Sequence, residues 1–86
     1  MNVRIVWAGR NYDLAASLPD ELTLPESASV DDALKMLSGC LPHNRRLPGT
    51  CLIAVSGTHL GCLQSHRNQP LKDGDELLVL WPVAGG

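Results

Sequence analysis

The residues with the clearest chemical potential end the sequence, as Pro82-Val83-Ala84-Gly85-Gly86. Two glycines bring no side chain to pack, and they lose the most backbone freedom on ordering. They leave a thread no wider than backbone, which can enter a narrow active site on another protein. A terminal carboxyl group has a pKa of roughly 3.3–3.7, so at neutral pH it is an anion able to attack a phosphoryl centre. The tail therefore predicts a reacting carboxylate at Gly86, with Gly85 beside it.

The cysteines and histidines form no recognisable metal pattern. These residues are Cys40, Cys51, Cys62, His43, His59 and His66. Nothing in their spacing matches known zinc sites, and an odd number of cysteines without a signal peptide argues against a disulfide framework. We expect the cysteines to be small buried hydrophobes, or a free surface thiol in the case of Cys40. Each histidine is expected at the surface or on an edge.

The acidic residues around Gly74 form the other cluster that could suggest a site. Asp73, Asp75 and Glu76 surround this glycine, but no calcium-loop spacing continues beyond them, so a turn is the expected structure. No Ser/His/Asp, Cys/His or phosphate-loop arrangement is present. We therefore expect no metal, no permanently bound cofactor and no catalysis by the chain alone.

Composition bounds the remaining possibilities. The 86 residues, 44% of them hydrophobic and 19% charged, suit one globular domain with an aliphatic core, since Phe is absent. The net charge of −2 offers no basic face for nucleic acid. No apolar run approaches a membrane span, and the N-terminus lacks a signal-peptide pattern. The cytoplasm is the expected location.

The clearest element expected to position the tail is a helix that begins after Ser29. Ser29 and Asp32 resemble a capping box, and Gly39 followed by Pro42 is placed to end the helix. Apolar residues recur at helical spacing, as Val30, Ala33, Leu34, Leu37 and Leu41.

Strands are expected on either side of this helix. Their predicted positions are residues 3–8, 21–25, 51–55, 59–60 and 77–80. This order indicates an α+β fold with a mixed four- to five-stranded sheet and one main helix across one face. If the first two strands form a hairpin and the last pairs beside the first, the fold is a β-grasp. We expect residues 1–82 to form one domain and residues 83–86 a flexible tail.

The last strand is apolar on both faces. A sheet covered by one helix should alternate apolar and polar residues, but Leu77-Leu78-Val79-Leu80 does not. Two interpretations stay open: the face away from the helix contacts a partner, or residues 42–50 and 61–69 cover it. The residues expected to contact a partner are Trp7, Leu80, Trp81, Pro82, Val83 and Ala84.

These residues carry a resemblance to a known family. Leu71 to Glu76, followed at a fixed distance by Pro82 to Gly86, resembles the C-terminal signature of the MoaD/ThiS superfamily of ubiquitin-like sulfur carriers. The likeness is greatest to its MoaD branch, the small subunits of molybdopterin synthase. The segments 25–37 and 52–60 also fit the family pattern. The chain departs from it at Trp7, where Phe is common, and at Leu80, where an aromatic residue is common.

The resemblance implies a reaction at Gly86. An adenylating partner resembling MoeB would use ATP to form an acyl-adenylate, and a sulfur donor acting through that partner would convert it to a thiocarboxylate. The tail would then enter a MoaE-like catalytic subunit and donate sulfur to the molybdopterin precursor. Three alternatives stay open: a ThiS-type carrier for thiamine or another pathway, a ubiquitin-like modifier, and a binding module whose glycines have no chemical role.

Overall fold

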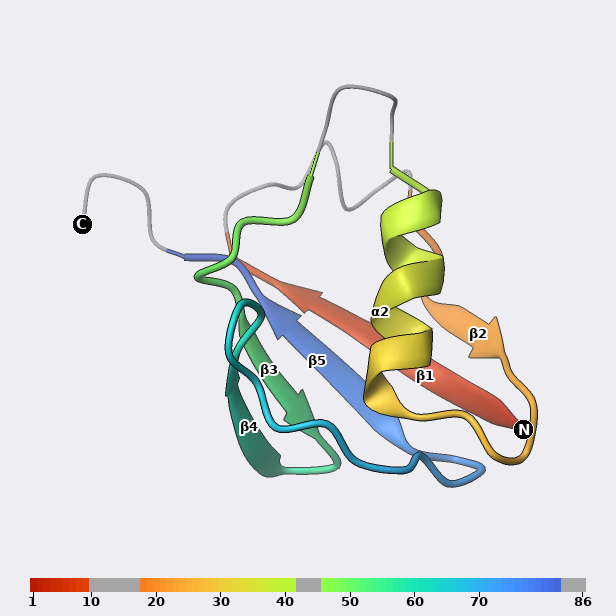
Figure 1. Ribbon diagram of the computed structural model, residues 1–86. Coiled ribbons are helices and arrows are strands. Elements are labelled where there is room, and N and C mark those ends of the chain that lie inside the picture. Colours follow the sequence, from red (N-terminus) through yellow and green to blue (C-terminus); the bar gives the residue numbers. More distant parts are fainter. Residues whose placement is uncertain (10–17, 42–45, 83–86) are drawn as a thin grey trace.

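The protein folds as a five-stranded mixed sheet with one helix across one face, as the computed structural model shows for residues 1–9, 18–41 and 46–82 (Figure 1). The elements are β1 (Asn2–Ala8), β2 (Glu21–Thr23), α2 (Val30–Gly39), β3 (Leu52–Val55), β4 (Thr58–Cys62) and β5 (Glu76–Leu80). The strand order is β2-β1-β5-β3-β4, in which β1 and β5 run parallel and the other pairs antiparallel. This topology confirms the predicted β-grasp.

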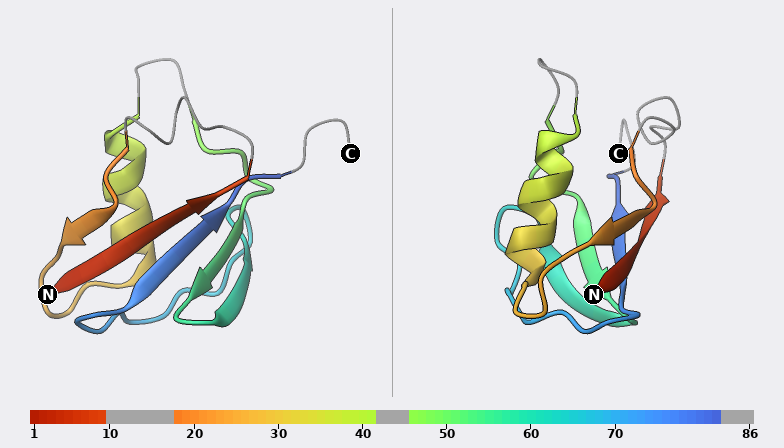
Figure 2. Two further views of the ribbon diagram at one scale, coloured as in Figure 1. Left: turned by 180° about the vertical axis from the view of Figure 1, so that it is seen from behind. Right: turned by 90° about the vertical axis from the view of Figure 1, so that its right-hand side faces the viewer.

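The core lies between α2 and the sheet, and it is mostly aliphatic, as predicted. The helix contributes four buried residues at the predicted spacing, which are Val30, Ala33, Leu34 and Leu37. They face the inward residues of the central strands, which are Val3, Ile5, Ile53, Leu77 and Val79. Seen edge-on, the sheet has the helix on one side only (Figure 2). From the sequence, a partner surface is expected on the face of the sheet away from the helix. That face is the one opposite α2.

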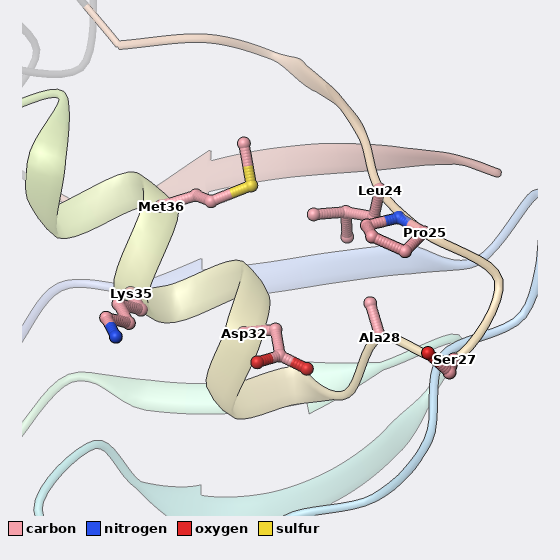
Figure 3. Close-up of a pocket in the computed structure, with 7 residues that line it drawn as sticks. All are labelled: Leu24, Pro25, Ser27, Ala28, Asp32, Lys35 and Met36. Atoms are coloured by element: carbon pink, nitrogen blue, oxygen red, sulfur yellow. The ribbon is translucent and has the colours of Figure 1, made fainter.

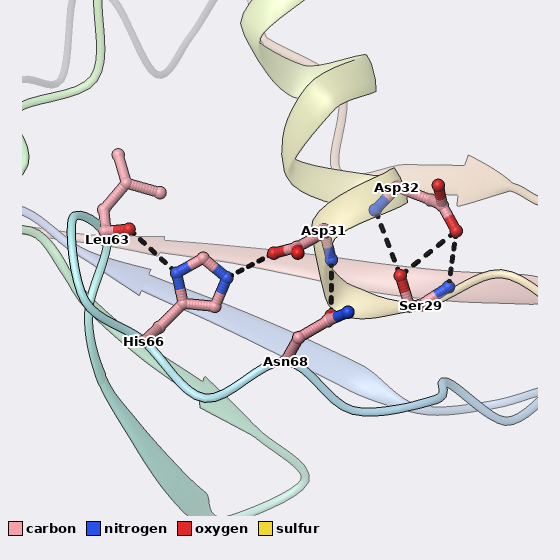
Figure 4. Close-up of polar contacts among 6 residues, drawn as sticks. All are labelled: Ser29, Asp31, Asp32, Leu63, His66 and Asn68. Carbon is pink, nitrogen blue, oxygen red and sulfur yellow. Dashed lines mark hydrogen bonds and ion pairs between the residues drawn. The ribbon is translucent and has the colours of Figure 1, made fainter.

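The N-terminus of α2 is held by a complete set of hydrogen bonds (Figure 4). The predicted capping box is present: the Asp32 N–H donates to Ser29 Oγ at 3.4 Å, and the Ser29 N–H donates to Asp32 Oδ2 at 2.9 Å. The Asp31 N–H donates to Asn68 Oδ1 at 2.9 Å. Since the first N–H groups of a helix lack partners within it, these contacts fix where α2 begins.

His66 joins the same network. Its Nδ1 lies 2.8 Å from the Leu63 carbonyl oxygen and its Nε2 lies 2.5 Å from Asp31 Oδ1. The ring thereby joins residues 63–66 to the first turn of α2. The prediction of a surface or edge residue holds only in part for His66, whose side chain is 13% exposed and is held between two segments. It holds for His59, which is exposed on β4, whereas His43 lies outside the described residues.

The strand boundaries differ from the predictions, by one residue at the start of β1, β3 and β5 and by more in β2 and β4. β2 ends at Thr23 instead of continuing to Pro25, which has no N–H to donate to a strand ladder. α2 ends at Gly39, as predicted, although the cap is Cys40 in a right-handed conformation and not a left-handed glycine. β4 continues to Cys62, beyond the short strand predicted around residues 59–60.

We predict that Ser29→Ala lowers the free energy of unfolding by about 0.5–2 kcal/mol, the usual effect of losing an N-cap. The backbone N–H and hydroxyl of Ser29 hold the pKa of the Asp32 carboxyl below its ordinary value. A carboxyl with a lowered pKa in the folded state stabilises above its unfolded pKa, and this contribution is lost as pH falls through the folded pKa.

Urea unfolding of wild type and Ser29→Ala, repeated from neutral pH down to pH 3, measures both effects. The difference between the two proteins is expected to shrink towards the acid end. Ser27→Ala is the matched control, because Ser27 is exposed just before the helix and lies outside the capping box. A Ser29→Ala midpoint equal to that of Ser27→Ala at neutral pH would contradict the role of the cap.

Candidate functional site

The tail leaves the fold from the centre of the sheet. β5 lies between β1 and β3 and ends at Leu80, and the next N–H, that of Trp81, donates to the Ala8 carbonyl oxygen at 2.8 Å. Pro82 is exposed and is the last described residue. The predicted reacting residues Gly85 and Gly86, and the predicted contacts Val83 and Ala84, lie outside the described residues. The fold therefore presents the tail from its most internal strand.

The turn before β5 is built by its acidic residues. Asp73 Oδ1 accepts the Asn2 N–H at 2.7 Å. Asp75 accepts from the Lys72 N–H at 2.8 Å and from the Ser56 hydroxyl at 2.9 Å. Each of these carboxylates is thus engaged in holding the chain, which confirms the interpretation of this cluster as turn chemistry.

The two tryptophans predicted to contact a partner lie on the helix side of the sheet. Trp7 packs against the core, and its Nε1–H donates to the Pro19 carbonyl oxygen at 3.0 Å. Trp81 is 4% exposed within the core, and its Nε1–H has no acceptor among the residues that the structure describes. Among the predicted contacts in the described segments, Pro82 is exposed and Trp7 and Leu80 are half-buried, but of these two only Leu80 faces away from the helix.

We predict that Trp7→Phe destabilises the protein more than Trp81→Phe does. The first change leaves the Pro19 carbonyl without its 3.0 Å donor, whereas the second removes a buried donor that has no described partner. A lost hydrogen bond with a group left unsatisfied costs about 1–3 kcal/mol. Denaturant midpoints of the two variants, which share the same change in side-chain volume, make the comparison. A larger loss in Trp81→Phe would contradict the prediction and show that filling the core at position 81 outweighs the hydrogen bond of Trp7.

The face of the sheet away from α2 carries a continuous apolar surface. Strand register places Ala8, Leu80 and Leu52 in one cross-strand row. The next row holds Val6, Leu78 and Ala54. We call these six residues the outer face. Leu52 is 43% exposed, Val6, Ala8, Leu78 and Leu80 are half-buried and Ala54 is buried, so the row beside the tail is the part accessible to a partner.

The sequence leaves open that residues 42–50 and 61–69 cover this surface. The parts of these two segments that the structure describes lie on the helix side of the sheet instead. His66 contacts Asp31 at the start of α2, which places the 61–69 segment beside the helix. Leu47 is buried in the core cluster, and the Gln64 N–H donates to the Gly49 carbonyl oxygen. The outer face is therefore not covered by residues 46–50 or 61–69 (Figure 2).

Sequence reasoning identified Leu80 but missed the other outer-face residues. Val6 and Leu78 are apolar at alternate positions in two different strands, and only the parallel pairing of β1 with β5 brings them together. The usable signal was the apolar character of both faces of β5. The apolar character of β5 indicated particular residues only once the strands that pair with it were known.

The groove beside α2 brings together none of the predicted site residues. It lies between the helix and residues 24–28, with Leu24, Ala28 and Met36 along it and Asp32 and Lys35 on the helix flank (Figure 3). Among the described residues, no three His, Cys, Asp or Glu side chains gather so as to hold a metal ion. The groove is separate from Trp81 and Pro82, where the tail begins.

The thiols differ in environment, and we predict that they differ in reactivity. Burial raises the pKa of Cys51 to about 11. The Ser65 hydroxyl, 3.1 Å from Cys62 Sγ, and nearby backbone N–H groups lower the pKa of Cys62. Since the thiolate is the nucleophile, iodoacetamide should modify Cys62 well before Cys51 in the folded protein. Cys40 is an exposed free thiol and Cys51 is buried, as predicted.

Peptide mapping after timed alkylation measures the order of reaction. All three cysteines should react together in denaturant, and Ser65→Ala should move the reaction of Cys62 to higher pH. Folded protein in which Cys51 reacts as fast as Cys62 would contradict the assignment.

In the described residues, a mixed sheet with β1 and β5 parallel at its centre and one helix across one face defines a β-grasp protein. The chain belongs to the ThiS family, whose family model matches residues 8–86. This confirms the predicted family of sulfur carriers. The molybdopterin synthase sulfur carrier subunit of Chlamydomonas reinhardtii is 22% identical over 86 residues, which cover the whole of both chains. No solved structure matches the chain, and none of the helices in its described part is long and apolar enough to cross a membrane.

Proposed function

We propose that this sulfur carrier serves molybdenum cofactor biosynthesis as the small subunit of a molybdopterin synthase. The observation that carries the pathway is the 22% identity, over the whole of both chains, to a protein named as a molybdopterin synthase sulfur carrier subunit, while the family match, which extends through the tail to Gly86, supports the sulfur-carrier class. The Pro82-Val83-Ala84 sequence before the glycines favours the MoaD branch.

The reacting group is the Gly86 carboxylate. One of its oxygens attacks the α-phosphorus of ATP and displaces pyrophosphate, which gives an acyl-adenylate. A hydrosulfide equivalent, supplied through the adenylating partner, then attacks the acyl carbon and expels AMP, which leaves a thiocarboxylate. ATP is used at Gly86 by that partner and is not a resident cofactor of this chain.

The outer face is the proposed docking surface for the MoeB-like adenylating enzyme and for the MoaE-like catalytic subunit. It is apolar and lies beside the root of the tail, so a bound partner would have the tail next to it. Arg4 lies between Glu21 and Glu76 on the same face and forms a charged border. Leu80 and Pro82 extend the surface towards the tail, followed by Val83 and Ala84.

Purified protein tests the proposal when it is mixed with ATP, the MoeB-like enzyme and the MoaE-like subunit from the same cell. We expect pyrophosphate exchange that depends on this chain, followed by a stable complex with the MoaE-like subunit. Adenylation without that complex, but with sulfur delivered to a thiazole-forming enzyme, would replace the pathway by the ThiS-type alternative. The family model that matches this chain is described as the ThiS family, which favours that alternative.

The remaining alternatives have their own outcomes in the same experiment. Conjugates of higher mass, in which Gly86 is joined to lysine side chains, would indicate a ubiquitin-like modifier. Failure to form any acyl-adenylate with the cognate activating enzyme would favour a binding module.

A further inference from the structure

The last residue before Pro82 packs directly against a glycine at the end of β1. Gly9 has a φ of +106°, in the region that side-chain-bearing residues rarely adopt. A Cβ placed on Gly9 would lie 2.7 Å from Trp81 Cβ and 2.9 Å from the Trp81 carbonyl oxygen. These separations are too short for real contacts. Position 9 therefore has no room for a side chain while Trp81 stays where it is.

Trp81 is restrained in three further ways. Its N–H donates to the Ala8 carbonyl oxygen at 2.8 Å, which extends the pairing of β1 and β5 by one residue, and its ring is 4% exposed in the core. The proline that follows it biases the Trp81 backbone towards extended conformations. The hydrogen bond, the burial of the ring and the following proline thus restrict the backbone at the point where the tail begins.

We infer that Gly9 and Trp81 are positioning residues that fix the point and the direction in which the Gly86 tail leaves the fold. The inference rests on the proposed function, because it concerns delivery of the Gly86 carboxylate. Four residues after Pro82 can span at most about 14 Å. If Trp81 is displaced, the region that the carboxylate can reach shifts with it. Misplacement by about 1 Å can lower a reaction rate 100-fold.

Gly9→Ala is the direct test, with Gly57→Ala as its matched control. Gly57 has a similar φ of +89°, but a Cβ there would meet nothing within 4 Å. Both variants therefore carry the same kind of backbone strain, and only the first displaces Trp81. The control lies in the turn between β3 and β4, outside the outer face and the tail.

Hydrogen exchange of the Trp81 amide is the first measurement. We expect strong protection in wild type and in Gly57→Ala, and at least tenfold faster exchange in Gly9→Ala. This result does not depend on any activity. It therefore tests the contact even if the chain proves not to be adenylated, in which case the proposed function fails and the restraint on Trp81 stands.

The second measurement is the rate of adenylation of Gly86 by the activating partner. We expect kcat to fall about tenfold or more in Gly9→Ala, while KM changes less than twofold because the outer face is intact. Partial unfolding would act differently, since it lowers the amount of competent protein and raises the apparent KM without lowering kcat at saturation. Gly57→Ala should keep the kcat of wild type.

A series at Pro82 decides the matter if Gly9→Ala does not fold. Pro82 is exposed, so Pro82→Ala and Pro82→Gly leave the core untouched. A restrained root predicts that kcat falls stepwise from Pro to Ala to Gly as the backbone gains freedom. Equal rates for Ala and Gly, or a folded Gly9→Ala with wild-type amide protection and kcat, would overturn the inference.

Discussion

Gly86→Ala, and separately one residue appended after Gly86, should abolish sulfur transfer and leave the fold unchanged. The methyl group of alanine stands beside the reacting carbon, and an appended residue moves the carboxylate away from the position that the activating enzyme reaches. Neither change touches the core between α2 and the sheet, so the denaturant midpoint should stay that of wild type. Transfer is measured as thiocarboxylate formed per chain with the adenylating partner, ATP and a sulfur source.

Gly39→Ala is the control for this pair. A Cβ at Gly39 would meet nothing within 4 Å, and the residue ends α2 far from the tail in the sequence. Its transfer activity should equal that of wild type. Sulfur transfer by the extended chain, without its being processed back to Gly86, would contradict the assignment of the reacting group.

Leu52→Asp should weaken binding of the adenylating partner about 30-fold or more, the usual size of an interface hot-spot effect. Leu52 is 43% exposed in the outer-face row that includes Leu80. A carboxylate there would be desolvated on binding without a counter-charge in the row. The measurement is the Kd of the binary complex, by calorimetry at one ionic strength.

Met36→Asp is a close match for this substitution. Met36 is 45% exposed, but it lies on α2 beside the groove on the opposite side of the sheet. It receives the same charge, and its Kd should equal that of wild type. Equal weakening by both variants would remove the outer face as the docking surface, and so would no weakening by Leu52→Asp.

Local patterns predicted the elements well because they act within a few residues. The capping box of Ser29 and Asp32 and the apolar stripe to Leu37 depend on helical spacing alone, and both are present. The turn at Asp73-Gly74 was predicted for the same reason. The pairing of the first and last strands was only a condition for the β-grasp, because propensity does not determine which strands pair.

Contacts between distant segments could not be predicted from local patterns. Trp81 continues the inward alternation of Leu77 and Val79, yet as the residue beside the tail it suggested partner contact. The bridge from His66 to Asp31 joins residues 35 positions apart. The space that Gly9 leaves for Trp81 exists only because β1 and β5 are parallel neighbours.

The reacting carboxylate is tested most directly by the intact mass of the protein isolated from its native cell. Exchange of one oxygen for sulfur, localised to Gly86 by fragmentation, is the predicted result, and a thiol-directed reagent should add one more label to that species than the cysteines alone accept. The same preparation from cells lacking the adenylating partner should show only the unmodified mass. A protein that carries no sulfur at Gly86 while its partners are active would contradict the account.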